Sequence, residues 1–163
     1  MKKLMFILLV AVFCVACDSN APTMENPKSV VIDSIMYTYY MKDLSGNYAT
    51  SFCRDSMLVV YLDIENLSQK ELQVSNDNML GDCYKIPSEE WIQEISIGHA
   101  ERDTASPIYV PLKQGIPVRK NCAYYLSDIS AGKYYYQAPT KSIINGRDTI
   151  TYDIPLSIKF EIK

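Results

Sequence analysis

Residues 56–66 read SMLVVYLDIEN, and this stretch has the pattern of a long β-strand. Successive side chains of a strand point to opposite faces, so one face is formed by the apolar residues Leu58, Val60, Leu62 and Ile64. The other face mixes apolar, aromatic and acidic side chains, namely Val59, Tyr61, Asp63 and Glu65. A strand with one apolar and one mixed face is typical of an antiparallel sheet that covers a core on one side. The stretch therefore predicts an all-β domain.

The flanking sequence extends this prediction. Alternating apolar residues run from Ile150 to Ile162, and Pro155 within them marks a bulge or a sheet edge because proline cannot donate a ladder hydrogen bond. Further strands are predicted at 29–41 with a bend at Asp33-Ser34, at 71–75, at 108–112 as an edge, at 118–129 and at 133–138. Residues 87–100 fit either a strand or a short helical turn. Residues 76–87 and 139–147 are predicted to be loops, and the first of these fails the test for a calcium loop because Pro87 stands where a bidentate glutamate is required.

Two segments resemble immunoglobulin-like sandwich domains of exported bacterial proteins. The pattern V-x-L-x-I-E-N-x-S-x-K-x-L-x-V, residues 60–74, is similar to the passage from the B strand to the C strand. The pattern Y-x-L-x-D-I-x-A-G-K-Y-x-Y-x-A, residues 124–138, is similar to the E–F hairpin of the same class. The resemblance implies an antiparallel immunoglobulin-like β-sandwich of about seven strands over residues 29–163.

Three cysteines remain outside the N-terminal segment and allow one disulfide. Folding the chain back about Ser68-Gln69 brings residue 53 opposite residue 83 or 84. A disulfide requires Cα atoms within roughly 4.4–6.8 Å of each other. Cys53–Cys83 is therefore the preferred pair of the three, which leaves Cys122 over. Separation of the two strands into different sheets would weaken this prediction.

The N-terminus reads MKKLMFILLVAVFCVAC. Two lysines, an apolar run and a small residue before the cut site are typical of a secretory signal, and the run is too short to span a bilayer. Val15-Ala16-Cys17 resembles a bacterial lipoprotein signal, although Cys14 departs from it. The resemblance implies a signal peptide at 1–16, lipid attachment at Cys17 and membrane association through that lipid. Residues 17–28 are polar and proline-containing, and are predicted to be a flexible tether.

A repeated pattern consists of Asp, then Ser or Thr, then an aliphatic residue. Its hydroxyl positions are Ser34, Ser56, Thr104 and Thr149. The pattern is similar to the O-glycosylation acceptor of exported Bacteroidota proteins; turn chemistry before strands explains it equally well. In that phylum, a single acid after the lipidated cysteine favours the outer membrane facing the periplasm, with the cell surface as the alternative.

The composition and motifs weigh against several function classes. The chain has a net charge of −3, and no basic cluster that would favour nucleic acid. His99 is the only histidine, so a histidine-based metal cluster is excluded, and no sequence motif for a catalytic serine, a phosphate or a dinucleotide surrounds the candidate residues. Glu89 and Glu90 fit a solvated turn better than a carboxylate pair. We expect no catalytic residues, metal or cofactor.

Two hypotheses about function follow. The first is a non-enzymatic, lipid-anchored module that binds another envelope protein or a glycan; the thirteen tyrosines favour it because tyrosine suits amphipathic contact surfaces. The alternative is an inhibitor or immunity protein against an exported protease or toxin, acting through the loop 76–87 or 101–107.

Overall fold

The computed structural model describes residues 25–76, 80–95 and 108–163. These residues form thirteen strands and one 3-10 turn, Gln93–Ile95, and include no α-helix. The predicted all-β class is confirmed. None of the described residues belongs to a helix with the length and apolar content needed to cross a membrane.

The strands form three hydrogen-bonded sheets. The first, in spatial order, contains β1 (Lys28–Ile32), β2 (Ile35–Lys42), β4 (Met57–Asn66) and β9 (Val118–Tyr125). The second contains β3 (Ser51–Phe52), β13 (Ser157–Ile162), β10 (Gly132–Gln137), β6 (Asp82–Ile86) and β7 (Glu90–Trp91). The third contains β12 (Asp148–Asp153), β11 (Thr140–Asn145), β5 (Leu72–Ser75) and β8 (Tyr109–Leu112). The named strands pair antiparallel except β3 with β13, which are parallel.

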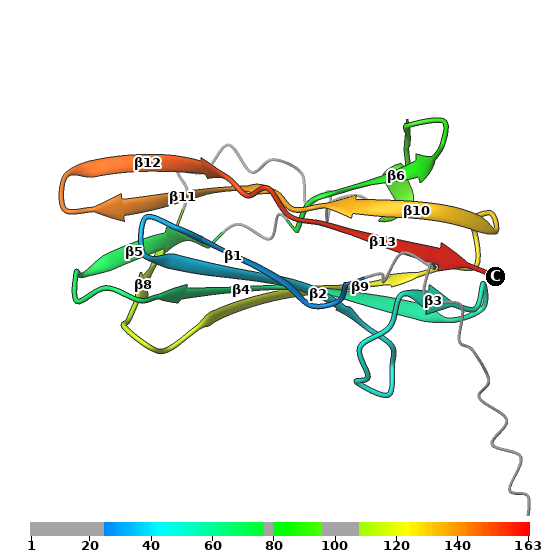
Figure 1. Ribbon diagram of the computed structural model, residues 1–163, viewed down its shortest axis with the longest axis horizontal. Helices are drawn as coiled ribbons and strands as arrows, with labels where there is room; N and C mark the ends of the chain where they lie inside the picture. The colour runs from blue at the N-terminus through cyan, green and yellow to red at the C-terminus, as the bar shows by residue number, and fades with distance from the viewer. Residues whose placement is uncertain (1–24, 77–79, 96–107) are drawn as a thin grey trace, which may run out of the picture.

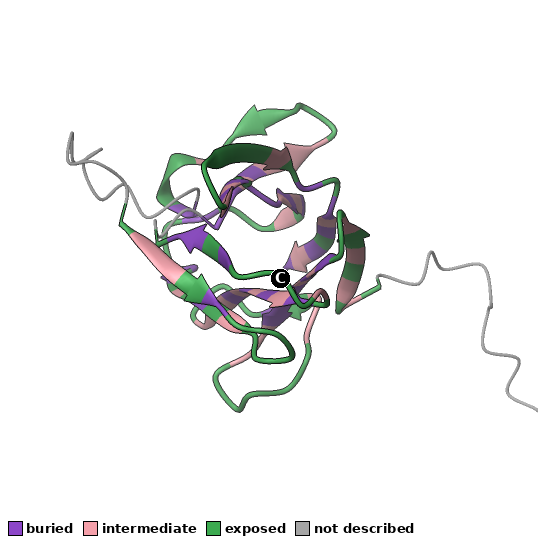
Figure 2. Cartoon of the chain, turned by 90° about the vertical axis from the view of Figure 1, so that its left-hand side faces the viewer, coloured by how far each residue is buried: buried purple, intermediate pink, exposed green. Residues whose placement is uncertain are grey.

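The sheets pack as two layers around one core (Figure 1). The first sheet is one layer, and β10, β11, β12 and β13 run along the other. Figure 2 shows the buried residues gathered inside this cross-section, with exposed loops and strand faces around them. The predicted inward face of β4 is confirmed, because each of its four apolar residues, Leu58, Val60, Leu62 and Ile64, is fully buried.

The predicted bend at Asp33-Ser34 is a complete reversal. These two residues have φ angles of 48° and 65°, as in the two-residue turn that matches the twist of a hairpin. β1 and β2 therefore pair with each other. The Asn26 side chain bonds to Met41 and Ala49, so Asn26, near the end of the predicted tether, is held by the domain.

The closing segment is two strands instead of one. From Ile154 onward the predicted alternation is confirmed, but Ile150 is 41% exposed. The segment around Pro155 separates β12 from β13, and the facing strand breaks at Ala138-Pro139. The Gln137 side chain bridges the break by donating to the carbonyls of Ile154 and Leu156. The predicted loops 76–87 and 139–147 in fact contain β6 and β11, so the expected number of strands was too low.

The predicted hairpin of residues 118–129 and 133–138 is wrong. β9 pairs with β4 in the first sheet, whereas β10 pairs with β13 and β6 in the second. The turn between them crosses from one layer to the other. The Tyr134 hydroxyl donates to the Ser130 carbonyl at 2.5 Å and fixes this corner.

The predicted Cys53–Cys83 disulfide is not formed. β4 and β5 lie in different sheets, so folding back about Ser68-Gln69 does not bring the two cysteines together. Phe52, next to Cys53, is opposite Ile162 in β13, whereas Cys83 is opposite Tyr136 in β10. Three strand spacings and several residues along the strands separate the two cysteines by roughly 20 Å. Cys53 is exposed and Cys83 is buried.

The Asn66 side chain is fully buried where β4 ends. Its Nδ2 donates to the carbonyls of Lys70 and Leu112, at 2.8 and 3.1 Å. Its Oδ1 accepts from the backbone N–H and hydroxyl of Ser68, at 2.8 and 2.7 Å. The Asn66 carbonyl accepts from the N–H of Gly115. One asparagine therefore joins the end of β4, the turn after it and the end of β8.

Gly81 lies just before β6 with a φ of 117°, and a Cβ there would lie 1.8 Å from the Gln137 carbonyl oxygen. We predict that Gly81→Ala lowers the free energy of unfolding by about 3 kcal/mol, because the side chain adds both backbone strain and overpacking. Urea unfolding at equilibrium measures this change.

Gly46→Ala is the matched control, because Gly46 also has a positive φ but a Cβ there meets nothing within 4 Å. This variant should lose only about 1 kcal/mol. Equal losses for the two variants would contradict the close approach at Gly81.

Candidate functional site

The outer face of the first sheet carries a compact group of aromatic and charged side chains. Strand alternation places Tyr39 and Met41 in the core, and it places Tyr40 and Lys42 on the outer face. We call this group the tyrosine–cation cluster, and its members are Tyr40, Lys42, Tyr48, Tyr61, Asp63 and Arg119. Tyr40 and Tyr61 are directly opposite each other in β2 and β4.

Three tyrosine rings of the cluster hold one another in place. The rings of Tyr40 and Tyr61 are parallel, with centroids 4.8 Å apart. The Tyr48 ring meets Tyr40 edge-on at 5.5 Å. Both geometries are favoured by the quadrupoles of aromatic rings. Tyr40 is thereby covered, at 3% exposure, while Tyr48 stays 55% exposed.

Two cations rest on these rings. The Lys42 Nζ lies 4.9 Å from the Tyr48 centroid and within 6 Å of the centroids of Tyr40 and Tyr61. The Arg119 guanidinium lies 6.0 Å from the Tyr61 centroid. It also donates two hydrogen bonds to Asp63, at 2.7 and 2.8 Å. Such contacts attract a cation to the negative face of the ring.

Asp63 links the tyrosines to the arginine. It accepts a hydrogen bond from the Tyr40 hydroxyl at 3.1 Å as well as the two from Arg119. Burial and the negative charge of Asp63 raise the pKa of Tyr40. The phenol is therefore protonated near neutral pH and acts as a donor. The cluster is held by hydrogen bonds and ring contacts before any partner arrives.

Apolar side chains continue this outer face beyond the cluster. Val31 of β1 is 55% exposed and Tyr125 of β9 is 73% exposed. Met57 of β4 is directly opposite Tyr125 and, like Val59, is half-buried, whereas Val31 lies near the other end of this face. Leu44, in the loop that also carries Tyr48, is 67% exposed. The face is therefore a mixed aromatic and aliphatic surface.

A second aromatic group lies on the outer face of the second sheet. We call it the aromatic–acid row, and its members are Trp91, Tyr84, Tyr135, Asp82 and Glu89. Tyr84 is opposite Tyr135 on one side and Trp91 on the other. The Tyr135 hydroxyl donates to Glu89 at 2.5 Å, and the Trp91 indole donates to Asp82 at 2.9 Å.

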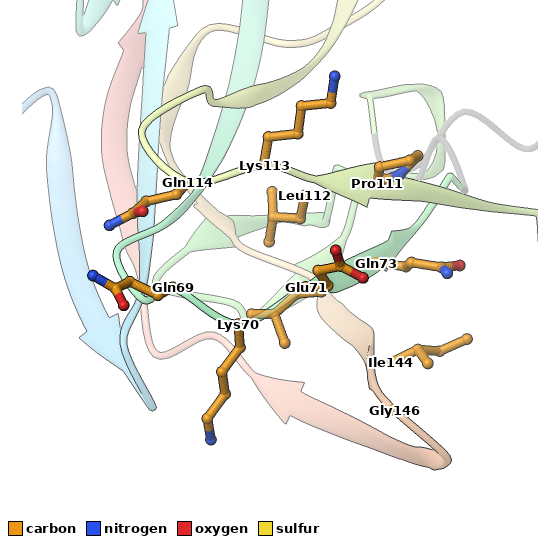
Figure 3. Close-up of a pocket in the computed structure, with 11 residues that line it drawn as sticks. Gln69, Lys70, Glu71, Gln73, Pro111, Leu112, Lys113, Gln114, Ile144 and Gly146 are labelled. Atoms are coloured by element: carbon orange, nitrogen blue, oxygen red, sulfur yellow. The ribbon is translucent and has the colours of Figure 1, made fainter.

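A hollow with a volume of about 610 Å³ lies between the turn after β4 and the end of β8. Figure 3 shows the ammonium groups of Lys70 and Lys113 extending away from each other, with Leu112 between them. Glu71 is the one carboxylate in its lining. A single acid among amides and lysines does not provide the acid–base pair that hydrolysis of a glycoside uses. Among the described residues, no three side chains of His, Cys, Asp or Glu are grouped as metal ligands.

The residues singled out from the sequence fall at scattered places. Cys17, His99 and Thr104 lie outside the described residues. Ser34 is exposed in the β1–β2 turn and Thr149 is exposed in β12, whereas Ser56 is half-buried. The Ser56 hydroxyl donates to the Cys53 carbonyl at 2.6 Å, as turn chemistry predicts. Glycosylation of the hydroxyls stays a prediction, and the structure does not bring them together into one site.

The tyrosine–cation cluster was not predicted from the sequence, although part of its signal is present there. The alternation of β2 and β4 already placed Tyr40 and Tyr61 on outward faces. The register that sets them opposite each other, and the arrival of Arg119 from β9, depend on strand pairings about 20 and 60 residues apart in sequence.

Comparisons with known proteins give little beyond this geometry. No family model and no curated protein matches the chain. Among solved structures, a Niemann-Pick type C2 protein from Japanese carpenter ant aligns with 86% of this chain and 95% of its own, at 13% identity and a TM-score of 0.36. At that score the likeness supports no statement about fold or function.

The hydrogen bond to Glu89 raises the pKa of Tyr135 to about 12. Deprotonation of the phenol would remove the donor and place two negative charges side by side. We predict that Glu89→Gln lowers the pKa of Tyr135 toward its ordinary value of about 10. NMR titration of selectively labelled tyrosine measures this shift.

Tyr152 provides the comparison in the same titration, because burial and a hydrogen bond to Asp33 raise its pKa on a different sheet. This pKa should be unchanged by Glu89→Gln. An unchanged pKa of Tyr135 in the variant would show that Glu89 does not hold its hydroxyl.

Proposed function

We propose that this protein is a non-enzymatic binding module whose partner is another protein of the cell envelope. The partner docks on the outer face of the first sheet, centred on the tyrosine–cation cluster. The observation that carries the proposal is the fixed arrangement of the cluster, in which each ring and cation already has its contacts. Groups fixed before binding lose little conformational freedom when a partner arrives.

The composition of the face supports a protein as the partner. Tyrosine, methionine and arginine are enriched at protein interfaces, and the first and last of these often carry most of the binding energy. Tyr48 and Tyr125 offer large exposed rings, and Arg119 offers a guanidinium at the edge. Met57 and Val59 supply aliphatic surface between them. This face therefore offers the exposed aromatic area expected of a binding module.

An immunoglobulin-like architecture is part of the proposal. It is supported by the two places where the chain crosses between layers, from β4 to β5 and from β9 to β10. The second crossing carries a tyrosine corner, in which Tyr134 bonds back to Ser130. Such a corner is a hallmark of this class of sandwich. The parallel pairing of β3 with the last strand makes β3 an edge strand of the second sheet.

Anchoring through a lipid on Cys17 would place this domain at a membrane, and we propose the periplasmic side of the outer membrane. The hydrogen bonds of Asn26 to Met41 and Ala49 support a link between the anchor and the binding face, because Lys42 and Tyr48 are their direct neighbours. The tether joins the domain beside the cluster. A partner docked there would itself be close to the membrane.

Crosslinking in the native host tests the proposal. The tagged, full-length protein is crosslinked in cells and its products are identified by mass spectrometry, beside the double variant Tyr48→Ala, Tyr61→Ala. We expect one dominant envelope protein with the wild type and at least about a tenfold loss of that product with the variant, since aromatic anchors commonly contribute more than 1 kcal/mol each.

Ile150→Ala is the matched control, because Ile150 is also an exposed apolar residue but lies on β12 in the third sheet. It should retain the product. Thermal unfolding of all variants excludes loss of the fold. Equal recovery with the double variant and the wild type would contradict the proposed face, and a secreted protease or toxin as the partner would favour the inhibitor hypothesis instead.

A further inference from the structure

The two outer faces use aromatic rings in different ways. On the first sheet, the protein's own Lys42 and Arg119 lie over the tyrosines. On the second sheet, Tyr84 and Tyr135 stack with centroids 5.1 Å apart, and no cation of the described residues lies over either ring. The tyrosine rings of the first sheet already hold cations of the protein itself, whereas the rings of Tyr84 and Tyr135 hold none from the described residues.

Carboxylates lie beside the rings of Tyr84 and Tyr135. Glu89 is fixed through its Oε2 by Tyr135, and Asp82 through its Oδ1 by Trp91. The second oxygen of each carboxylate accepts no hydrogen bond from a described side chain. Besides burial, both acids raise the pKa of Tyr84, which places their negative charge close to its ring. Two held carboxylates beside stacked rings make a region complementary to a cation.

The lysines near the aromatic–acid row do not remove its complementarity to a cation. Lys159 is opposite Tyr135, and Lys133 is at the end of the same strand, so both border the row. The Lys85 ammonium donates to the Ser130 hydroxyl at 2.9 Å. Glu90, opposite Lys85 in β7, adds a further acid at the edge. The acidic side of the row is thus the side of β6 and β7, next to Trp91.

We propose that the aromatic–acid row binds an arginine side chain of a partner protein. A guanidinium stacks on a tyrosine or tryptophan face and donates paired hydrogen bonds to carboxylates. The free oxygens of Asp82 and Glu89 are acceptors for those bonds. A quaternary ammonium group has no N–H to give them, so it would use only half of the site. This second contact surface is independent of the tyrosine–cation cluster.

Trp91 makes the site directly observable, because it is the only tryptophan of the chain. Its fluorescence is followed while the purified protein is titrated at low salt with the peptide acetyl-Gly-Arg-Gly-Arg-Gly-amide. The same peptide with citrulline in place of arginine keeps the shape and removes the charge. We expect a saturable change with the arginine peptide and none with the citrulline peptide.

Variants distinguish binding of the arginine peptide at this site from its general attraction to an acidic protein. Glu89→Gln and, separately, Tyr84→Ser should each weaken binding of the arginine peptide about tenfold, while Ile150→Ala on β12 of the third sheet leaves the affinity unchanged. Equal responses to the arginine and citrulline peptides would overturn the proposal, as would an unchanged affinity in Glu89→Gln. Saturation by tetramethylammonium chloride but not by the arginine peptide would also overturn it, in favour of a lipid headgroup. None of these outcomes bears on the proposed docking at the tyrosine–cation cluster.

Discussion

The buried amide of Asn66 is the interaction on which the arrangement of the two layers depends. It ends the longest strand, holds the following turn through Ser68 and Lys70, and reaches the carbonyl of Leu112 at the end of β8. Burial of an amide destabilises the folded state unless its hydrogen bonds are made. The backbone around Asn66 therefore adopts the conformation that satisfies them. The chain must therefore leave the first sheet here and enter the other layer. That crossing places β5 in the third sheet, away from β4.

The strands with clear alternation could be predicted from sequence, and the pairings could not. Leu58 to Ile64 and Ile154 to Ile162 lie as their period of two requires, because each residue of these runs faces the core or solvent for local reasons. Ile150 does not, since Pro155 breaks the strand and β12 runs along a sheet edge. β6 and β11 were missed because polar residues interrupt them. The wrong Cys53–Cys83 pair came from assuming that consecutive strands share a sheet.

The ring and cation contacts of the candidate site likewise depend on how the strands pair. Outward positions of Tyr40 and Tyr61 follow from alternation alone, but only the register makes them stack. Arg119 joins them because β9 pairs with β4 on its far side. The two outer faces then differ in a simple respect. On one the rings hold cations of the protein itself, whereas on the other they lie beside fixed carboxylates.

The most direct test of the central claim is hydroxyl-radical footprinting of the protein in its native cells and after purification. We expect Tyr48, Tyr61 and Tyr125 to be oxidised several-fold less in cells than in the purified protein. Ile150, which is exposed on β12, should be oxidised equally in both. Equal oxidation of the three tyrosines in the two samples would contradict the claim that this sheet face is covered by a partner.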